Sequence, residues 1–262
     1  MSNKNRYTQL IERMFKKHYT KGASEVSFKR EDLVETANEL GIKLPKNLGD
    51  IIYSFRYRTE LPASIRKEAP KGLEWIIRPM GQSQYKFALA SSPRITPNPM
   101  LSETKIPDAT PGIIASYALN DEQALLAKLR YNRLIDIFTG ITCYSLQNHL
   151  RTTVRGIGQI ETDELYVGVD LKGIQYILPV QGKGGSDQLN IVQIEQDIAM
   201  CLEKFPHLVC IPTAAQFMDE NLIALFSFEE DKKGVSILSE KHYRLVPHEE
   251  LSNEELLSYR NR

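Results

Sequence analysis

Residues 159–185, QIETDELYVGVDLKGIQYILPVQGKGG, decide how this chain is expected to fold. The segment Asp-Leu-Lys-Gly at 170–173 predicts a type I turn closed by a glycine with positive φ, which leaves Asp170 opposite Ile174. The apolar run Tyr-Ile-Leu-Pro-Val that follows is typical of a strand covered on both faces. The stretch therefore predicts a β-hairpin whose second strand lies inside a sheet.

The expected hairpin brings charged and amide side chains together near its open end. With this turn, Asp163 faces Gln181 and Glu161 faces Lys183. Alternation along each strand then puts all four side chains on one face of the sheet. A bulge or a two-residue turn would instead bring Glu164 forward, so the key acid is either Asp163 or Glu164.

Asp163, followed by Gln181-Gly182-Lys183 at the end of an apolar strand, resembles the PD-(D/E)XK nuclease superfamily of restriction-endonuclease-like folds. It is most similar to the Mrr-like branch, in which Gln replaces the second acid. The resemblance covers residues 120–245, where a long helix, the hairpin, an amphipathic helix and further strands follow the αβββαβ order of that fold. It implies an α/β domain in which a mixed sheet is flanked by helices.

The same resemblance implies roles for the motif residues. Asp163 would bind a divalent cation, Gln181 would occupy the second ligand position, and the carbonyl of Gly182 would be a further ligand. Lys183 would orient or deprotonate the attacking water and offset charge on the phosphate. The implied cofactor is Mg²⁺, for which Mn²⁺ can substitute, because hard cations prefer oxygen ligands.

Two features of the motif depart from the usual pattern of that superfamily. Thr162 stands where a proline usually precedes the acid, and the neutral Gln181 leaves the site one negative charge short. Glu161, expected opposite Lys183, is a candidate catalytic residue that could supply the missing charge.

Composition indicates an ordinary soluble globular protein of 262 residues, with 42% hydrophobic and 25% charged residues. No apolar run approaches the length of a membrane span, and the N-terminal residues lack the apolar stretch of a signal peptide, so we expect a cytoplasmic protein without membrane contact. The cysteines, three in number, and the histidines, five in number, show no disulfide framework and no metal-ligand spacing.

Charge is unevenly distributed although the chain has a formal net charge of zero. Residues 1–90 hold 17 Lys and Arg against 10 Asp and Glu, and by difference from the chain totals residues 91–262 hold 16 against 23. A basic first part is typical of a module that binds a polyanion such as DNA. A merely solvated basic surface is the alternative on charge alone.

Local patterns in residues 5–90 predict three helices and a two-stranded wing. The third helix is expected to start at Pro45, with Leu48, Ile51, Ile52 and Phe55 forming its buried stripe. Strands are expected at 73–77 and 84–89. This order resembles a winged helix-turn-helix domain, a fold that also serves in protein contacts. The polar side chains expected to reach double-stranded DNA are Lys46, Asn47, Tyr53, Arg56 and Arg58.

The remainder of the chain is expected to form a linker and the nuclease domain. Residues 91–112 carry five prolines and predict a semi-rigid extended linker between a domain at 1–90 and a domain at 113–262. In the latter, helices are expected over 121–138, capped by Asn120 or Asp121, and over 189–204. The first strand is expected over 144–160, and alternating strands follow residue 206.

Together these patterns predict a Mg²⁺-dependent endodeoxyribonuclease of the type II restriction or genome-defence kind. Cutting both strands needs two sites, so a homodimer is expected. One alternative is a DNA-binding regulator with a degenerate nuclease domain, which the missing second acid favours. Another is a structure-selective repair or junction nuclease. No Gly-x-Ser-x-Gly motif supports a serine hydrolase.

Overall fold

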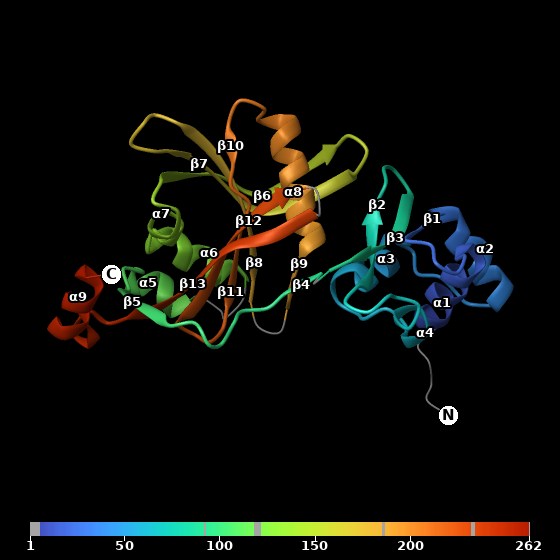
Figure 1. Cartoon of the computed structure of the whole chain (residues 1–262), viewed down its shortest axis with the longest axis horizontal. Helices are drawn as coiled ribbons and strands as arrows, with labels where there is room; N and C mark the ends of the chain where they lie inside the picture. Colours follow the sequence, from blue (N-terminus) through green and yellow to red (C-terminus); the bar gives the residue numbers. More distant parts are fainter. Residues whose placement is uncertain (1–5, 92, 118–121, 185–186, 232–233, 262) are drawn as a thin grey trace. The chain divides into compact units, whose positions relative to one another are not determined.

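The computed structural model describes residues 6–91, 93–117, 122–184, 187–231 and 234–261, and the chain forms two compact units. The first unit comprises residues 1–95, 152–160 and 190–192, and the second comprises residues 96–151, 161–189 and 193–262. Among the described residues, no helix has the length and apolar character needed to cross a bilayer. The chain is therefore a mixed α/β protein in two parts (Figure 1).

The first unit combines helices with an antiparallel sheet in the strand order β1-β3-β2. Its elements are α1 (Arg6–His18), β1 (Glu25–Lys29), α2 (Arg30–Leu40), α3 (Gly49–Tyr57), α4 (Ala63–Arg66), β2 (Glu74–Pro79), β3 (Gln84–Ala90) and β4 (Arg94–Ile95). Helix α1 buries Leu10, Ile11 and Met14 at helical spacing, as the sequence predicts. Phe15 of the same helix packs edge-on against Phe87, with ring centroids 5.0 Å apart, so α1 is joined to the sheet.

Two details of the first unit differ from the expectation. Phe28 lies in strand β1, which pairs with β3 and adds a third strand to the expected pair. The third helix begins at Gly49 instead of Pro45. The side chain of Asn47 accepts a hydrogen bond from the Gly49 amide at 3.0 Å and donates to Asp50 at 2.7 Å, which forms an Asx turn where a helix had been expected.

The second unit is built on a mixed sheet that runs β5-β13-β12-β11-β8-β7-β6 through the described residues, with β10 beside β8. Its strands are β5 (Glu103–Pro107), β6 (Thr142–Val154), β7 (Gly158–Val169), β8 (Gln175–Lys183), β9 (Leu189–Asn190), β10 (Val209–Cys210), β11 (Thr213–Phe217), β12 (Leu222–Asp231) and β13 (Gly234–Val246). Its helices are α5 (Gly112–Tyr117), α6 (Glu122–Tyr131), α7 (Leu134–Thr139), α8 (Ile191–Lys204), the short 3-10 helix His248–Glu250 and α9 (Asn253–Arg260).

Helices α6 and α8 cover opposite faces of strand β8. A side chain at Gly182 would point at α6, since an added Cβ would lie 3.3 Å from Leu126 and 3.6 Å from Leu125. The neighbouring Gln181 instead bonds to Asp197 of α8. Successive strand residues point to opposite faces, so the sheet is sandwiched between the two helices, as the apolar run in β8 predicts.

Local breaks account for the differences between expected and observed elements in the second unit. The helix expected over 121–138 is interrupted at Arg133, whose φ of +53° leaves the helical region, and continues as α7. Its expected cap at Asn120 or Asp121 lies outside the described residues. The strand expected over 144–160 is two strands, β6 and β7, because the chain turns at 155–157.

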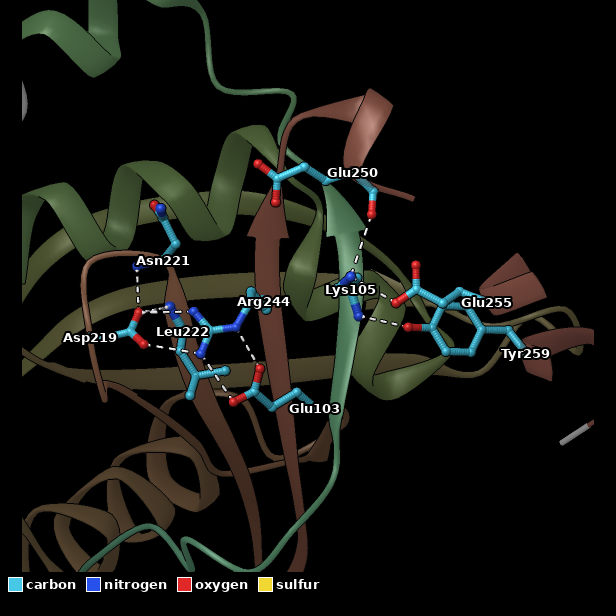
Figure 2. A network of polar contacts seen from close by, with 9 residues as sticks. All are labelled: Glu103, Lys105, Asp219, Asn221, Leu222, Arg244, Glu250, Glu255 and Tyr259. Atoms are coloured by element: carbon cyan, nitrogen blue, oxygen red, sulfur yellow. Dashed lines mark hydrogen bonds and ion pairs between the residues drawn. The ribbon is translucent and has the colours of Figure 1, made fainter. Parts of the chain in front are cut away.

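One edge of the sheet lies in the segment expected to be linker. Strand β5 pairs in parallel with β13, and its last residue, Pro107, is tolerated because the strand is at an edge. Figure 2 shows how this edge is tied down: Lys105 pairs with Glu255 of α9 at 2.7 Å, and its amide donates to the Tyr259 hydroxyl at 3.0 Å. Helix α9 thereby accepts a hydrogen bond from a backbone amide of the edge strand.

We expect Gly168→Ala to destabilise the second unit by about 1–3 kcal/mol, the usual cost of overpacking. A Cβ at this position would lie 2.7 Å from Ile141 Cγ2 and 3.3 Å from the Thr142 carbonyl, in the interior of the sheet. Gly112→Ala is the matched control, because nothing lies within 4 Å of its Cβ position. Urea unfolding of both variants measures the difference, and equal midpoints would contradict the expectation.

Candidate active site

The expected turn and register of the hairpin are confirmed for residues 164–180. Gly173 has φ +82° and donates to the Asp170 carbonyl at 3.0 Å, and Asp170 donates to Ile174 at 3.1 Å. The ladder between β7 and β8 runs from Glu164–Val180 to Val169–Gln175. The turn chemistry therefore sets which residues come together at the other end.

Asp163 and Lys183 meet where this ladder ends. The Asp163 carboxylate accepts a hydrogen bond from the Gly182 amide at 2.9 Å, in place of a backbone carbonyl. The Lys183 ammonium lies 3.7 Å from the same carboxylate oxygen. Both side chains are nearly buried, at 10% and 12% exposure, so their charges interact with little screening by water.

A second carboxylate, that of Glu122 at the start of α6, also contacts Lys183. Glu122 was not identified as a site residue from the sequence. Its Oε1 lies 3.4 Å from the Lys183 ammonium. Glu122 also lies close to Gly182, since a Cβ added there would be 3.6 Å from Glu122 Cγ and in tight contact with Leu126 at 3.3 Å. The site therefore comprises two acids and one ammonium drawn from α6, β7 and β8.

The two carboxylates of the acid pair repel each other, and the Lys183 ammonium offsets this repulsion only in part. Burial, and after it the adjacent Asp163 carboxylate, raise the pKa of Glu122 to about 8, although the Lys183 ammonium lowers it in part. Two carboxylates held together in this way favour either a shared proton or a bound cation. The donor set, Asp163, Glu122 and the Gly182 carbonyl, consists of the oxygen ligands that Mg²⁺ prefers.

We expect Glu122→Gln to stabilise the protein at pH 8 in EDTA. The pKa of Glu122 is higher in the folded chain than its ordinary value of 4.5. The raised pKa therefore adds stability to wild type below pH 4.5, and this contribution is lost as the pH rises through about 8. The amide has no proton to lose. Thermal unfolding at pH 4.5 and pH 8 tests this, with Glu203→Gln as the exposed control. A variant without any gain at pH 8 would refute it.

Gln181 is directed toward α8 and not toward Asp163. Its amide nitrogen donates to Asp197 at 2.8 Å and to the Glu161 carbonyl at 3.2 Å, while its oxygen accepts from Gln193 at 3.0 Å. Its side chain is fully buried. The expectation that alternation places it on the same face as Asp163 is not met, because the regular ladder ends before these residues. Its amide oxygen is already engaged, so we do not carry it forward as a metal ligand.

The remaining acids of the hairpin have other partners. Glu161 is half exposed, and its carboxylate pairs with Arg151 of β6 at 3.1 Å, so we assign the second acid beside Lys183 to Glu122 and not to Glu161. Glu164 is fully buried, 2.8 Å from Arg130 Nε and bonded to the Ser145 hydroxyl at 2.7 Å. Of the two alternatives for the key acid, these contacts favour Asp163.

In the first unit, the expected DNA-contacting residues are exposed to solvent except Arg56, which is partly buried. Lys46 and Asn47 are exposed but precede α3, and Tyr53 is 49% exposed with the Arg58 guanidinium 5.1 Å from its ring centroid. Arg56 instead packs between Tyr57 and Tyr85, 5.5 and 5.7 Å from their centroids. Lys46, Asn47, Tyr53 and Arg58 are thus the exposed members of the predicted set, and of these Asn47 already uses its side chain in the turn before α3.

The second unit is thus an α/β domain with a mixed sheet flanked by helices. Asp163 and Lys183, from two adjacent strands, form a cluster with Glu122 from the start of α6. Within the part of the chain that the structure describes, no group of three or more His, Cys, Asp or Glu side chains is arranged to hold a metal ion. No model of a protein family, no curated protein and no solved structure matches the chain.

Proposed function

We propose that the protein is a metal-dependent DNA endonuclease of the restriction or genome-defence kind, whose second unit is a PD-(D/E)XK-like catalytic domain. The observation that carries the proposal is the contact of Lys183 with both Asp163 and Glu122, at 3.7 and 3.4 Å. Two oxygen-donor acids beside an ammonium, at the end of an antiparallel strand pair, suit hydrolysis of a phosphodiester.

The order of the elements supports this assignment. Helix α6, strands β6, β7 and β8, helix α8 and strand β11 follow the αβββαβ order, with the short elements α7, β9 and β10 between them. Strand β11 lies parallel to β8, as a crossover through α8 requires. Asp163 belongs to the middle strand of the three, and Lys183 ends the third.

Asp163, Glu122 and the Gly182 carbonyl would hold Mg²⁺ or Mn²⁺, which when bound would polarise the scissile phosphate and lower the pKa of the attacking water. Lys183 would offset the negative charge that develops on the phosphate and orient the water. The Gly182 amide fixes one oxygen of Asp163 by its 2.9 Å hydrogen bond.

We further propose that the first unit is a winged-helix-like domain that binds double-stranded DNA. Its order α1-β1-α2-α3-α4-β2-β3 and its antiparallel sheet support this, as does the excess of basic residues over 1–90. Lys46, Tyr53 and Arg58 would contact phosphates or base edges. The protein would act as a homodimer, because cutting both strands needs two sites.

Incubating the protein with supercoiled plasmid in Mg²⁺, Mn²⁺ or EDTA tests the proposal. We expect nicked and linear products with either cation and none in EDTA. A DNA-binding regulator with a degenerate nuclease domain is the second candidate, and the engaged Gln181 amide favours it because the site then offers two acids and no third side-chain ligand. Salt-sensitive DNA binding without scission in either cation would favour the regulator and overturn the nuclease.

A further inference from the structure

Asp197 of α8 is a buried carboxylate that bonds to both catalytic strands. The Thr162 hydroxyl of β7 donates to one of its oxygens at 2.5 Å, and the Gln181 amide of β8 donates to the other at 2.8 Å. Its side chain is 1% exposed. Each donor directly precedes a residue of the candidate site: Thr162 precedes Asp163, and Gln181 precedes Gly182 and Lys183.

Gln181 joins the same carboxylate to two further groups. Its amide nitrogen also donates to the Glu161 carbonyl of β7, and its oxygen accepts from Gln193, one helical turn before Asp197. Regular backbone pairing of β7 and β8 is described only up to Glu164–Val180. Beyond that point, side-chain hydrogen bonds link the two strands, directly at Asp163 and Gln181 and by way of Asp197 of α8.

Burying the Asp197 carboxylate costs free energy of folding, which a residue that only fills space would not require. Burial raises its pKa to about 7, although the hydrogen bonds from Thr162 and Gln181 favour the charged form. Both of these donors are neutral. Apolar packing at a buried position is usually less costly than a buried carboxylate, so the hydrogen-bond geometry is the gain that can offset the cost.

We propose that Asp197 is a positioning residue for phosphodiester cleavage: it fixes the spacing between the β7 segment carrying Asp163 and the β8 segment carrying Lys183. This inference rests on the proposed nuclease function. Asp197 touches neither the metal site nor the phosphate. It acts through Thr162 and Gln181, which set the backbone positions of the residues that do.

The geometry gives a defined kinetic expectation. Displacing a reacting group by about 1 Å can cost on the order of 100-fold in rate. We therefore expect Asp197→Asn to lower kcat by about 10- to 100-fold while KM for plasmid changes by less than about threefold. An asparagine presents one oxygen and one NH₂, so the carboxylate charge is lost and one of the two hydrogen bonds must reverse, with the Thr162 hydroxyl accepting instead of donating.

Thr162 supplies the conservative pair of variants. Thr162→Val keeps the shape of the side chain but removes the hydroxyl that donates to Asp197, and we expect the same loss of kcat. Thr162→Ser retains the donor and should restore kcat to within about threefold of wild type. Glu203→Gln changes a carboxylate on the same helix that pairs with Lys204 at the surface, and it should cleave as wild type does.

The experiment measures kcat, KM and the unfolding temperature of these variants beside Lys183→Ala and Thr213→Val, the latter a buried control on β11. Loss of kcat in Asp197→Asn and Thr162→Val with rescue in Thr162→Ser supports the inference. If Asp197→Asn and Thr162→Val both cleave at the wild-type rate, the positioning role of Asp197 is overturned while the nuclease function stands. The same holds if Thr213→Val is destabilised to a similar degree and loses as much kcat. Wild-type protein that does not cut, or cutting unaffected by Lys183→Ala, overturns the nuclease and the inference together.

Discussion

Lys183→Ala is expected to reduce the rate of DNA cleavage by at least about 100- to 1,000-fold, the usual cost of removing one electrostatic contact to a transition state. Lys183 is the cation that contacts both acids of the site, and its side chain is 12% exposed. Its ammonium is therefore poorly screened and acts strongly on a nearby phosphate. Single-turnover cleavage of plasmid with Mg²⁺ measures the effect.

The control for this variant lies in the same hairpin. Lys172 is exposed in the turn between β7 and β8, so Lys172→Ala removes a positive charge without touching the cluster and should cleave as wild type does. Lys183→Arg keeps the charge but replaces a compact ammonium with a planar fork, and we expect it to recover only part of the rate. Cleavage by Lys183→Ala within threefold of wild type would contradict the proposed role.

The hairpin and its Asp–Lys pair were predictable from the sequence because they depend on local chemistry. Gly173 can adopt the positive φ that the turn requires, and the turn then fixes the register of the paired strands. Helical spacing likewise predicted α1, and a continuous apolar run predicted the buried strand β8. These patterns arise from neighbours in the chain, and no distant contact is needed to read them.

The position of Glu122 could not be predicted in the same way, because it depends on how α6 packs across the sheet. The signal that was present is Gly182: a glycine inside a strand marks a close approach by another element. Here that element is the first turn of α6. The sequence identifies the glycine but not the helix that fills the space beside it.

The side-chain directions of Gln181 and Glu161 were wrong for a related reason. Strict alternation assumes an unbroken ladder, whereas the described pairing ends at Glu164–Val180. Beyond it, Asp163 takes the Gly182 amide and Gln181 turns to Asp197. Tertiary hydrogen bonds outweigh alternation at a strand end, and such ends are where functional side chains concentrate.

Asp163→Asn is expected to lower cleavage by about 1,000-fold or more, whereas Glu164→Gln should chiefly affect stability. Asparagine keeps an oxygen that can accept from the Gly182 amide, so the fold is retained while a metal-binding charge is lost. Glu164 is fully buried beside Arg130, and loss of its charge should cost about 1–3 kcal/mol because its hydrogen-bonding partners then face a neutral group.

Glu122 gives this comparison a readout that is independent of cleavage. The Asp163 carboxylate raises the pKa of Glu122 both through a hydrogen bond and through its charge. Asp163→Asn should therefore lower the pKa of Glu122, and the decline in stability from pH 5 to pH 8 should be shallower than in wild type. Glu164→Gln should leave that slope as it is. If Glu164→Gln abolishes cleavage in a folded protein while Asp163→Asn retains it, the key acid is Glu164 and the site is one residue further along the strand.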